Sequence, residues 1–250
     1  MPLHQRARQS QRHERVAAAP LDHRTDRSGG KLIEVRQPDL NFVPGTGRKR
    51  SGKRLLTVGT DCSTGKMYTT LALETEMRAR GLTADFRATG QTGIFIAGRG
   101  IPLDAVVADF ISGGVEWLSP ERHDNGWDLI EGQGSLFHPS FAGVSLGLLH
   151  GAQPDALVLC DEPGRPHMRG LAHYQVPRLS DTLEANLAAA RLTNPAVVAV
   201  GVSLNTSKLS AEDAARVCAE AEDRLGLPAQ DPLRNGVAKI VDRLQACFPD

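Results

Sequence analysis

A glycine-rich loop at residues 59–66, with the sequence GTDCSTGK, is the clearest candidate for chemistry in the chain. Backbone N–H groups of such a loop bind phosphate oxygens together with the N-terminus of a following helix, and Lys66 adds a mobile positive charge. The loop departs from the usual GxxxxGK[ST] pattern, because five residues separate Gly59 from Gly65 and Met67 replaces the residue that holds Mg²⁺. Thr69 or Thr70, about one helical turn on, is a candidate substitute for that hydroxyl. The loop predicts a phosphate-bearing ligand, with a ligand-free glycine turn as the alternative.

Four polar side chains elsewhere could act on a bound substrate. Glu131 ends an apolar run, where an acid could hold Mg²⁺, act as a general base or brace a loop. His138 could serve in acid–base chemistry, although a lone His before a Pro is more often structural. Gln91 and Thr92 could hydrogen-bond a polar substrate or brace a turn.

Two further side chains are candidates for ligand contacts. Arg165 follows Asp161 and Glu162 in a Pro/Gly-rich loop, and it could clamp a carboxylate or phosphate or pair with those acids. Asn205, at the end of an apolar run, could bind an adenine edge or serve in a turn. No GxSxG elbow and no HxxxH or HExxH zinc spacing occurs in the sequence, so we predict no metal site.

Apolar runs and helical patterns alternate from residue 54 onward and predict the elements that position these residues. Strand-like runs occupy residues 54–58, 83–89, 127–135, 155–164 and 195–205. Helical patterns occupy residues 66–80, 102–114, 181–192, 210–225 and 236–247. This alternation predicts an α/β fold, a P-loop-type parallel sheet with helices on both faces. Because ligands bind at the carboxyl ends of such strands, the loops that follow them should line one rim.

The composition sets the class of protein. The 250 residues are 40% apolar and 23% charged with a formal net charge of zero, which provides no basic field for nucleic acid. No apolar run approaches the about 20 residues that cross a bilayer, and the four cysteines lack ligand spacing. We therefore expect a cytoplasmic protein that binds neither nucleic acid nor membrane. Residues 1–30, rich in Arg, Gln and His, predict a disordered leader, followed by a linker at 31–53 and one domain at 54–250.

Longer motifs carry two resemblances. GTDCSTGK, EGQGSL and VSLNTS together resemble the dethiobiotin synthetase branch of P-loop proteins, whose loop is similarly one residue longer. Residues 31–248 resemble the D-glutamate N-acetyltransferase (DgcN-like) family more closely. That match rests on KLIEVRQP, VGTDCSTGKM, ATGQTGIFIAGRGIPLDAVVADF, EGQGSLFHPSFAGVSLGLLHGAQPDALVLC, EPGR and GLPAQDPLR. Met67 belongs to the pattern of this second family.

The second resemblance implies transfer of an acetyl group from acetyl-CoA to the amino group of D-glutamate, an acidic amino acid. It implies contacts to the phosphate-bearing ligand from Gly59, Thr60, Asp61, Gly65 and Lys66. From the rim argument, we also expect Glu131, Gln133 and His138 near the substrate, with Glu131 or His138 as the catalytic base.

One departure from that family concerns its N-terminal Rossmann-like domain, which residues 1–30 do not resemble. We expect that domain to be absent here and the exposed surface to favour a homo-oligomer. Two alternatives stay open. The first is an ATP- and Mg²⁺-dependent ligase or kinase of the dethiobiotin synthetase type, and the second is an inactive nucleotide-binding fragment.

Overall fold

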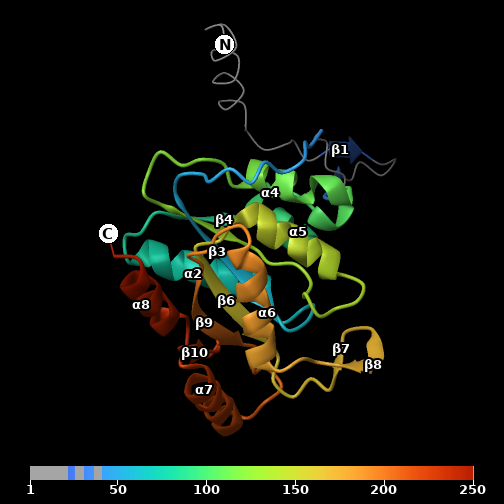
Figure 1. The fold of residues 1–250 in the computed structure, drawn as a ribbon. Helices are drawn as coiled ribbons and strands as arrows, with labels where there is room; N and C mark the ends of the chain where they lie inside the picture. The colour runs from blue at the N-terminus through green and yellow to red at the C-terminus, as the bar shows by residue number, and fades with distance from the viewer. Residues whose placement is uncertain (1–21, 26–30, 37–40, 250) are drawn as a thin grey trace, which may run out of the picture.

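A six-stranded, all-parallel β-sheet forms the centre of the computed structural model, which describes residues 22–25, 31–36 and 41–249 (Figure 1). The strand order is β10-β9-β6-β3-β5-β4. The strands are β3 (Lys53–Gly59), β4 (Ala84–Arg87), β5 (Trp127–Ile130), β6 (Ala156–Asp161), β9 (Val198–Leu204) and β10 (Ala229–Gln230). The parallel pairing confirms the predicted α/β class.

Helices cover both faces of this sheet, as predicted. They are α2 (Lys66–Ala79), α3 (Gln91–Ala97), α4 (Ile111–Leu118), α5 (Ala142–Ala152), α6 (Leu179–Arg191), α7 (Ala211–Leu225) and α8 (Ala238–Cys247). Alternate side chains of a strand point to opposite faces. Leu55 of β3 therefore packs with Leu73 and Met77 of α2, whereas Leu56 packs with Val115 of α4 and Leu148 of α5. Because both faces are buried, the central strands are continuous apolar runs.

The prediction of one helix over residues 102–114 is wrong for residues 102–110, whereas residues 111–114 belong to α4. Two short 3₁₀ turns, η1 (Leu103–Ala105) and η2 (Ala108–Phe110), precede α4 instead. Val106 and Val107 between them have extended ψ angles of 136°, and the side chain of Val107 is 65% exposed. The helical spacing of apolar residues there does not correspond to one buried face, and β-branched valines lose side-chain freedom in a helix.

Helices α3 and α5 were not predicted, because both contain glycine, which lowers helix propensity. Gly147 and Gly151 of α5 face α4 at close range. A Cβ added at Gly151 would lie 2.5 Å from the carbonyl oxygen of Ser112. The glycines that obscure the helical pattern therefore permit this helix pair to pack closely. By contrast, Ser210 begins α7 as predicted, since its Oγ accepts a hydrogen bond from the backbone N–H of Asp213.

Two small antiparallel ribbons lie outside the main sheet. The first pairs β1 (Asp22–Thr25) with β2 (Lys31–Glu34), and the second is a hairpin of β7 (His167–Met168) and β8 (Leu171–Gln175). Of the predicted leader 1–30, only the four residues of β1 are described, so its disorder stays a prediction. None of the described helices has the length and apolar character required to span a membrane.

Candidate functional site

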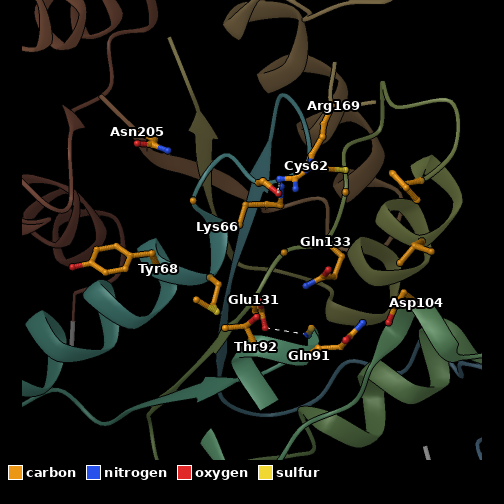
Figure 2. Close-up of a pocket in the computed structure, with 18 residues that line it drawn as sticks. Cys62, Lys66, Tyr68, Gln91, Thr92, Asp104, Glu131, Gln133, Arg169 and Asn205 are labelled. Carbon is orange, nitrogen blue, oxygen red and sulfur yellow. Dashed lines mark hydrogen bonds between the residues drawn. The ribbon is translucent and has the colours of Figure 1, made fainter. Parts of the chain in front are cut away.

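A cavity of about 810 Å³ opens at the carboxyl ends of β3, β4, β5 and β9 (Figure 2). Its volume falls in the about 300–1,000 Å³ range of ligand pockets. It is lined by Cys62, Ser63, Gly65, Lys66, Met67, Tyr68, Gly90, Gln91, Thr92, Asp104, Glu131, Gly132, Gln133, Gly134, Phe141, Val144, Arg169 and Asn205. Seven predicted site residues are among them, namely Gly65, Lys66, Gln91, Thr92, Glu131, Gln133 and Asn205. The other predicted residues lie behind this surface.

The glycine loop turns directly into α2 at the cavity wall. Gly65 has a φ of 102°, a conformation that side chains disfavour, and it leads into the first residue of the helix. The Lys66 Nζ donates a hydrogen bond of 2.7 Å to the carbonyl oxygen of Asp61. Burial lowers the pKa of Lys66, and an anion beside the ammonium would counter that effect. The loop thus combines a helix N-terminus with a buried lysine, as an anion site requires.

Arg165 holds the outer side of this loop and does not line the cavity. Its guanidinium donates to Asp61 Oδ2 at 2.6 Å, to Cys62 O at 2.7 Å and to Ser63 O at 3.1 Å. It also forms an ion pair with Glu162. In a trans peptide the N–H points away from the preceding C=O. Because Arg165 holds two carbonyls on the outside of the loop, the N–H groups that follow them turn toward the cavity. Of the two roles predicted for Arg165, the structure shows the pairing with acids, here Asp61 and Glu162.

Asp61 and Thr60 are buried structural members of the loop. Asp61 Oδ1 accepts from the backbone N–H of Cys62 at 2.7 Å, and Oδ2 accepts from the backbone N–H of Arg169 at 2.7 Å. The Thr60 hydroxyl donates to Asp161 Oδ1 at 2.5 Å. Neither residue lines the cavity and the side-chain oxygens of both form these hydrogen bonds, so both stabilise the shape of the loop.

His138 is 1% exposed and lies behind the cavity wall. Its Nδ1 accepts from the backbone N–H of Ser140 at 3.2 Å, which leaves the proton on Nε2, 3.1 Å from the carbonyl oxygen of Arg169. Its ring packs on Phe141 with centroids 4.5 Å apart. With both nitrogens engaged, His138 does not occupy the position expected of a catalytic base.

Glu131 lies on the cavity wall at the end of β5 and is 4% exposed. Its Oε2 accepts from the backbone N–H of Thr89 at 2.9 Å and from that of Gly90 at 3.1 Å, and the dashed line at Glu131 in Figure 2 marks the second of these bonds. Burial raises the pKa of Glu131, and these hydrogen bonds only partly oppose the shift. Gln133 Nε2 donates to the hydroxyl of Thr89 at 3.0 Å. Glu131 therefore braces the start of α3 and is also a carboxylate at the cavity that burial makes more basic.

The hydroxyl groups after the loop are already engaged inside the protein. Thr69 Oγ1 is 2.7 Å from Ser203 Oγ, and Thr70 Oγ1 donates to the carbonyl oxygen of Lys66 at 2.7 Å. Met67, which lines the cavity, offers sulfur where Mg²⁺ prefers oxygen. Gly59 lies beneath the loop, where an added Cβ would be 2.8 Å from Thr64 Oγ1. The structure does not bring Thr69 to the cavity as a Mg²⁺ ligand.

Among the described residues, one group has the proximity of a metal site. Ligand atoms of Asp61, Cys62 and His138 lie within 4.8 Å of one another. The hydrogen bonds above occupy the carboxylate and both imidazole nitrogens, and the guanidinium of Arg165 pairs with Asp61. This positive surrounding disfavours a cation.

Sequence reasoning missed Arg169, Tyr68 and Asp104. Arg169 comes from the turn of the β7–β8 hairpin, and Asp104 pairs with Arg36 at 2.9 Å. Nothing in the sequence distinguishes Arg169 from Arg165, four residues earlier. Only the hairpin geometry shows that Arg169 reaches the cavity and that Arg165 does not.

Comparisons with known proteins place the chain in a family. A family model described as the P-loop domain of DUF1611, a domain of unknown function, matches residues 41–241. A protein named D-glutamate N-acetyltransferase from Pseudoalteromonas sp is 57% identical over 213 residues, or 85% of this chain. A second one of that name, from Tritonibacter scottomollicae, is 54% identical over 219 residues, or 88% of this chain. The chain spans 64% and 66% of the lengths of these two relatives.

A solved structure supports the same assignment. The crystal structure of a DUF1611 family protein from Anabaena variabilis superposes with a TM-score of 0.80 at 35% sequence identity. The match covers 86% of this chain and 64% of that protein.

Proposed function

The chain belongs to the DUF1611 family, and on that premise we propose that it carries out acetyl transfer from acetyl-CoA to the amino group of D-glutamate. The names of two relatives more than half identical to it support this activity. The observation that carries the proposal is the joint presence of Lys66 and Glu131 in a cavity where Met67 replaces the Mg²⁺-binding residue. Such a site can bind an anion and offers a base, but it lacks the Ser/Thr hydroxyl that holds Mg²⁺ in P-loop proteins that transfer phosphate.

In this mechanism Glu131 accepts a proton from the ammonium group of the amino acid. The neutral nitrogen attacks the thioester carbonyl carbon, a C–N bond forms and the C–S bond breaks. The nitrogen then loses its second proton, which the departing thiolate takes up to leave as the free thiol of CoA. Backbone N–H groups of the glycine loops stabilise the oxyanion on the carbonyl. Burial, which raises the pKa of Glu131, makes this carboxylate a stronger base for the first step.

The remaining contacts divide between the two substrates. Lys66 and the loop residues Cys62, Ser63 and Gly65, which line the cavity, hold phosphate groups of acetyl-CoA, and Asn205 contacts the same molecule. Gln91, Thr92 and Gln133 offer amide and hydroxyl groups to the acidic amino acid. Arg165 supports the grip from behind, through its bonds to the loop carbonyls.

We also propose a cytoplasmic homo-oligomer. The four cysteines are free, as expected for a reducing compartment. Phe95 and Ile96 of α3 expose 66% and 54% of their surface, and such apolar residues favour association. Light scattering during gel filtration measures the oligomeric state directly, and a monomer at all concentrations would contradict it.

Calorimetric titration separates this proposal from an ATP-dependent ligase or kinase. We expect heat of binding with acetyl-CoA and none with MgATP. Tight MgATP binding without acetyl-CoA binding would overturn the proposal. Lys66→Ala should weaken acetyl-CoA binding by about 10- to 100-fold, because it removes a charged hydrogen-bond donor. Lys239→Ala, on the exposed surface of α8, is the matched control and should bind as the unsubstituted protein does.

A further inference from the structure

A second cationic side chain lines the same cavity as Lys66. Arg169 lines the cavity from the turn between β7 and β8, and its side chain is exposed. Its guanidinium donates to the hydroxyl of Ser63 in the glycine loop. Among the residues that the structure describes, no carboxylate forms an ion pair with this guanidinium. The Arg169 guanidinium is therefore a cation without an ion-pair partner among the described residues.

The backbone of Arg169 is fixed on both sides. Its N–H donates to Asp61 Oδ2 at 2.7 Å, and its carbonyl oxygen accepts from Nε2 of His138 at 3.1 Å. Asp61 and His138 are both buried, at 0% and 1% exposure. Two buried polar groups from separate loops thus hold one exposed residue at the mouth of the cavity. Such preorganisation lowers the entropy lost when a charged side chain binds a ligand.

The charges around the cavity favour an anion at this end. Figure 2 shows Arg169 and Cys62 on one side in this view, Glu131 and Thr92 on the other, and Lys66 between them. Two acids line the cavity, Glu131 and Asp104, and the charge of Asp104 is balanced by its ion pair with Arg36. Arg169 therefore lies on the glycine-loop side of the cavity, and Lys66 lies between it and the proposed base (Figure 2).

We propose that Arg169 binds a phosphate group of acetyl-CoA together with Lys66, and that Asp61 and His138 are positioning residues for Arg169. This inference rests on the proposed function, because it names which group of the acyl donor the site holds. It also accounts for the buried His138, which lacks the free nitrogen of a base. A planar guanidinium suits phosphate because it can donate two parallel hydrogen bonds.

The first test is calorimetric binding of CoA, which requires no turnover. Arg169→Gln should weaken CoA binding by about 10- to 100-fold, whereas Arg216→Gln on the exposed face of α7 should leave it unchanged. If the unsubstituted protein binds no CoA, the proposed function fails along with the inference. If it binds CoA and Arg169→Gln binds equally well, the inference alone is overturned.

The second test asks which anion Arg169 holds. With acetyl-CoA as donor, Arg169→Gln should raise the KM for the donor by about 10-fold or more. With S-acetyl-N-acetylcysteamine, an acetyl thioester without phosphate, the same variant should behave as the unsubstituted protein. A raised KM for D-glutamate with both donors would instead assign Arg169 to the substrate carboxylate and overturn the proposal.

A double-mutant cycle tests the positioning role. His138→Phe removes the donor to the carbonyl oxygen of Arg169 and should weaken CoA binding. His138→Gln, whose amide can donate, should recover part of that loss. In the Arg169→Gln background neither substitution should weaken binding further, since His138 acts through Arg169. Additive losses would show a merely structural role for His138 and overturn this part of the proposal.

Discussion

At the scale of single residues, burial of Glu131 has two consequences. It raises the pKa of the carboxylate and so makes it a stronger base, and it disfavours the ionised form that must accept the proton. Glu131→Gln keeps an oxygen acceptor for the N–H groups of Thr89 and Gly90 but cannot take up a proton. We expect turnover to fall by about 100-fold or more while CoA binding is retained. Steady-state kinetics and calorimetry measure the two effects separately, and unchanged turnover would remove Glu131 from the mechanism.

The same residue predicts a pH dependence of activity. The base works only when ionised, so kcat/KM should fall as the pH drops through the raised pKa of Glu131. The Glu131→Gln variant should lack that acidic limb. An identical acidic limb in the variant would assign the titration to another group.

Stability should change with pH in the opposite sense at this residue. Because the folded-state pKa is raised above the unfolded value, the folded protein binds the proton more tightly. The contribution of Glu131 to stability is therefore present at low pH and is lost as pH rises through the folded pKa. Glu131→Gln should raise the free energy of unfolding near neutral pH, by about 1 kcal/mol, and by less in acid. Denaturant titrations at several pH values check this, and a destabilised variant at neutral pH would contradict it.

At the scale of elements, the close approach of β3 and β5 fixes where Lys66 and Glu131 meet. Gly132 follows β5, and an added Cβ would lie 1.7 Å from the carbonyl oxygen of Thr57 in β3 and 2.9 Å from Cδ of Lys66. Gly132→Ala should therefore unfold the site or prevent folding. Gly143→Ala is the matched control, because an added Cβ there meets no atom within 4 Å. The substitution also replaces a glycine of α5 by a residue of higher helix propensity. It should stabilise the protein by about 0.5–1 kcal/mol, and thermal unfolding of both variants measures the contrast.

The sequence predicted the elements that have a regular apolar pattern or a clear cap. It did not predict a glycine-containing helix or the roles of residues whose positions depend on the path of a loop. The central strands follow from continuous apolar runs, and α7 follows from its Ser210 cap. Helix α3 was missed because a glycine, Gly93, interrupts its pattern next to Glu131. The roles of Arg165 and Arg169 could not be separated, since both depend on the path of the β7–β8 hairpin. Seven predicted site residues line the cavity because they lie in the loops that follow the strands or at the starts of the helices after those loops.

At the scale of the whole molecule, a chain without net charge concentrates two cations in one cavity. Arg169 and Lys66 supply that local field, whereas the arginines elsewhere that pair with acids are neutralised, as Arg122 is by Asp124 and Asp128. A local field of this kind attracts an anionic ligand without making the whole surface basic. The chain spans about two thirds of the relatives named D-glutamate N-acetyltransferase, so its own activity is the central question.

Release of free thiol from acetyl-CoA, followed with and without D-glutamate, tests the central claim most directly. We expect D-glutamate-dependent release, N-acetyl-D-glutamate as the product by mass spectrometry, and loss of both in Lys66→Ala. The relative from Pseudoalteromonas sp is the positive control. If that relative releases thiol and this chain binds acetyl-CoA but releases none above background, the chain is a binding module and the acetyltransferase proposal is contradicted.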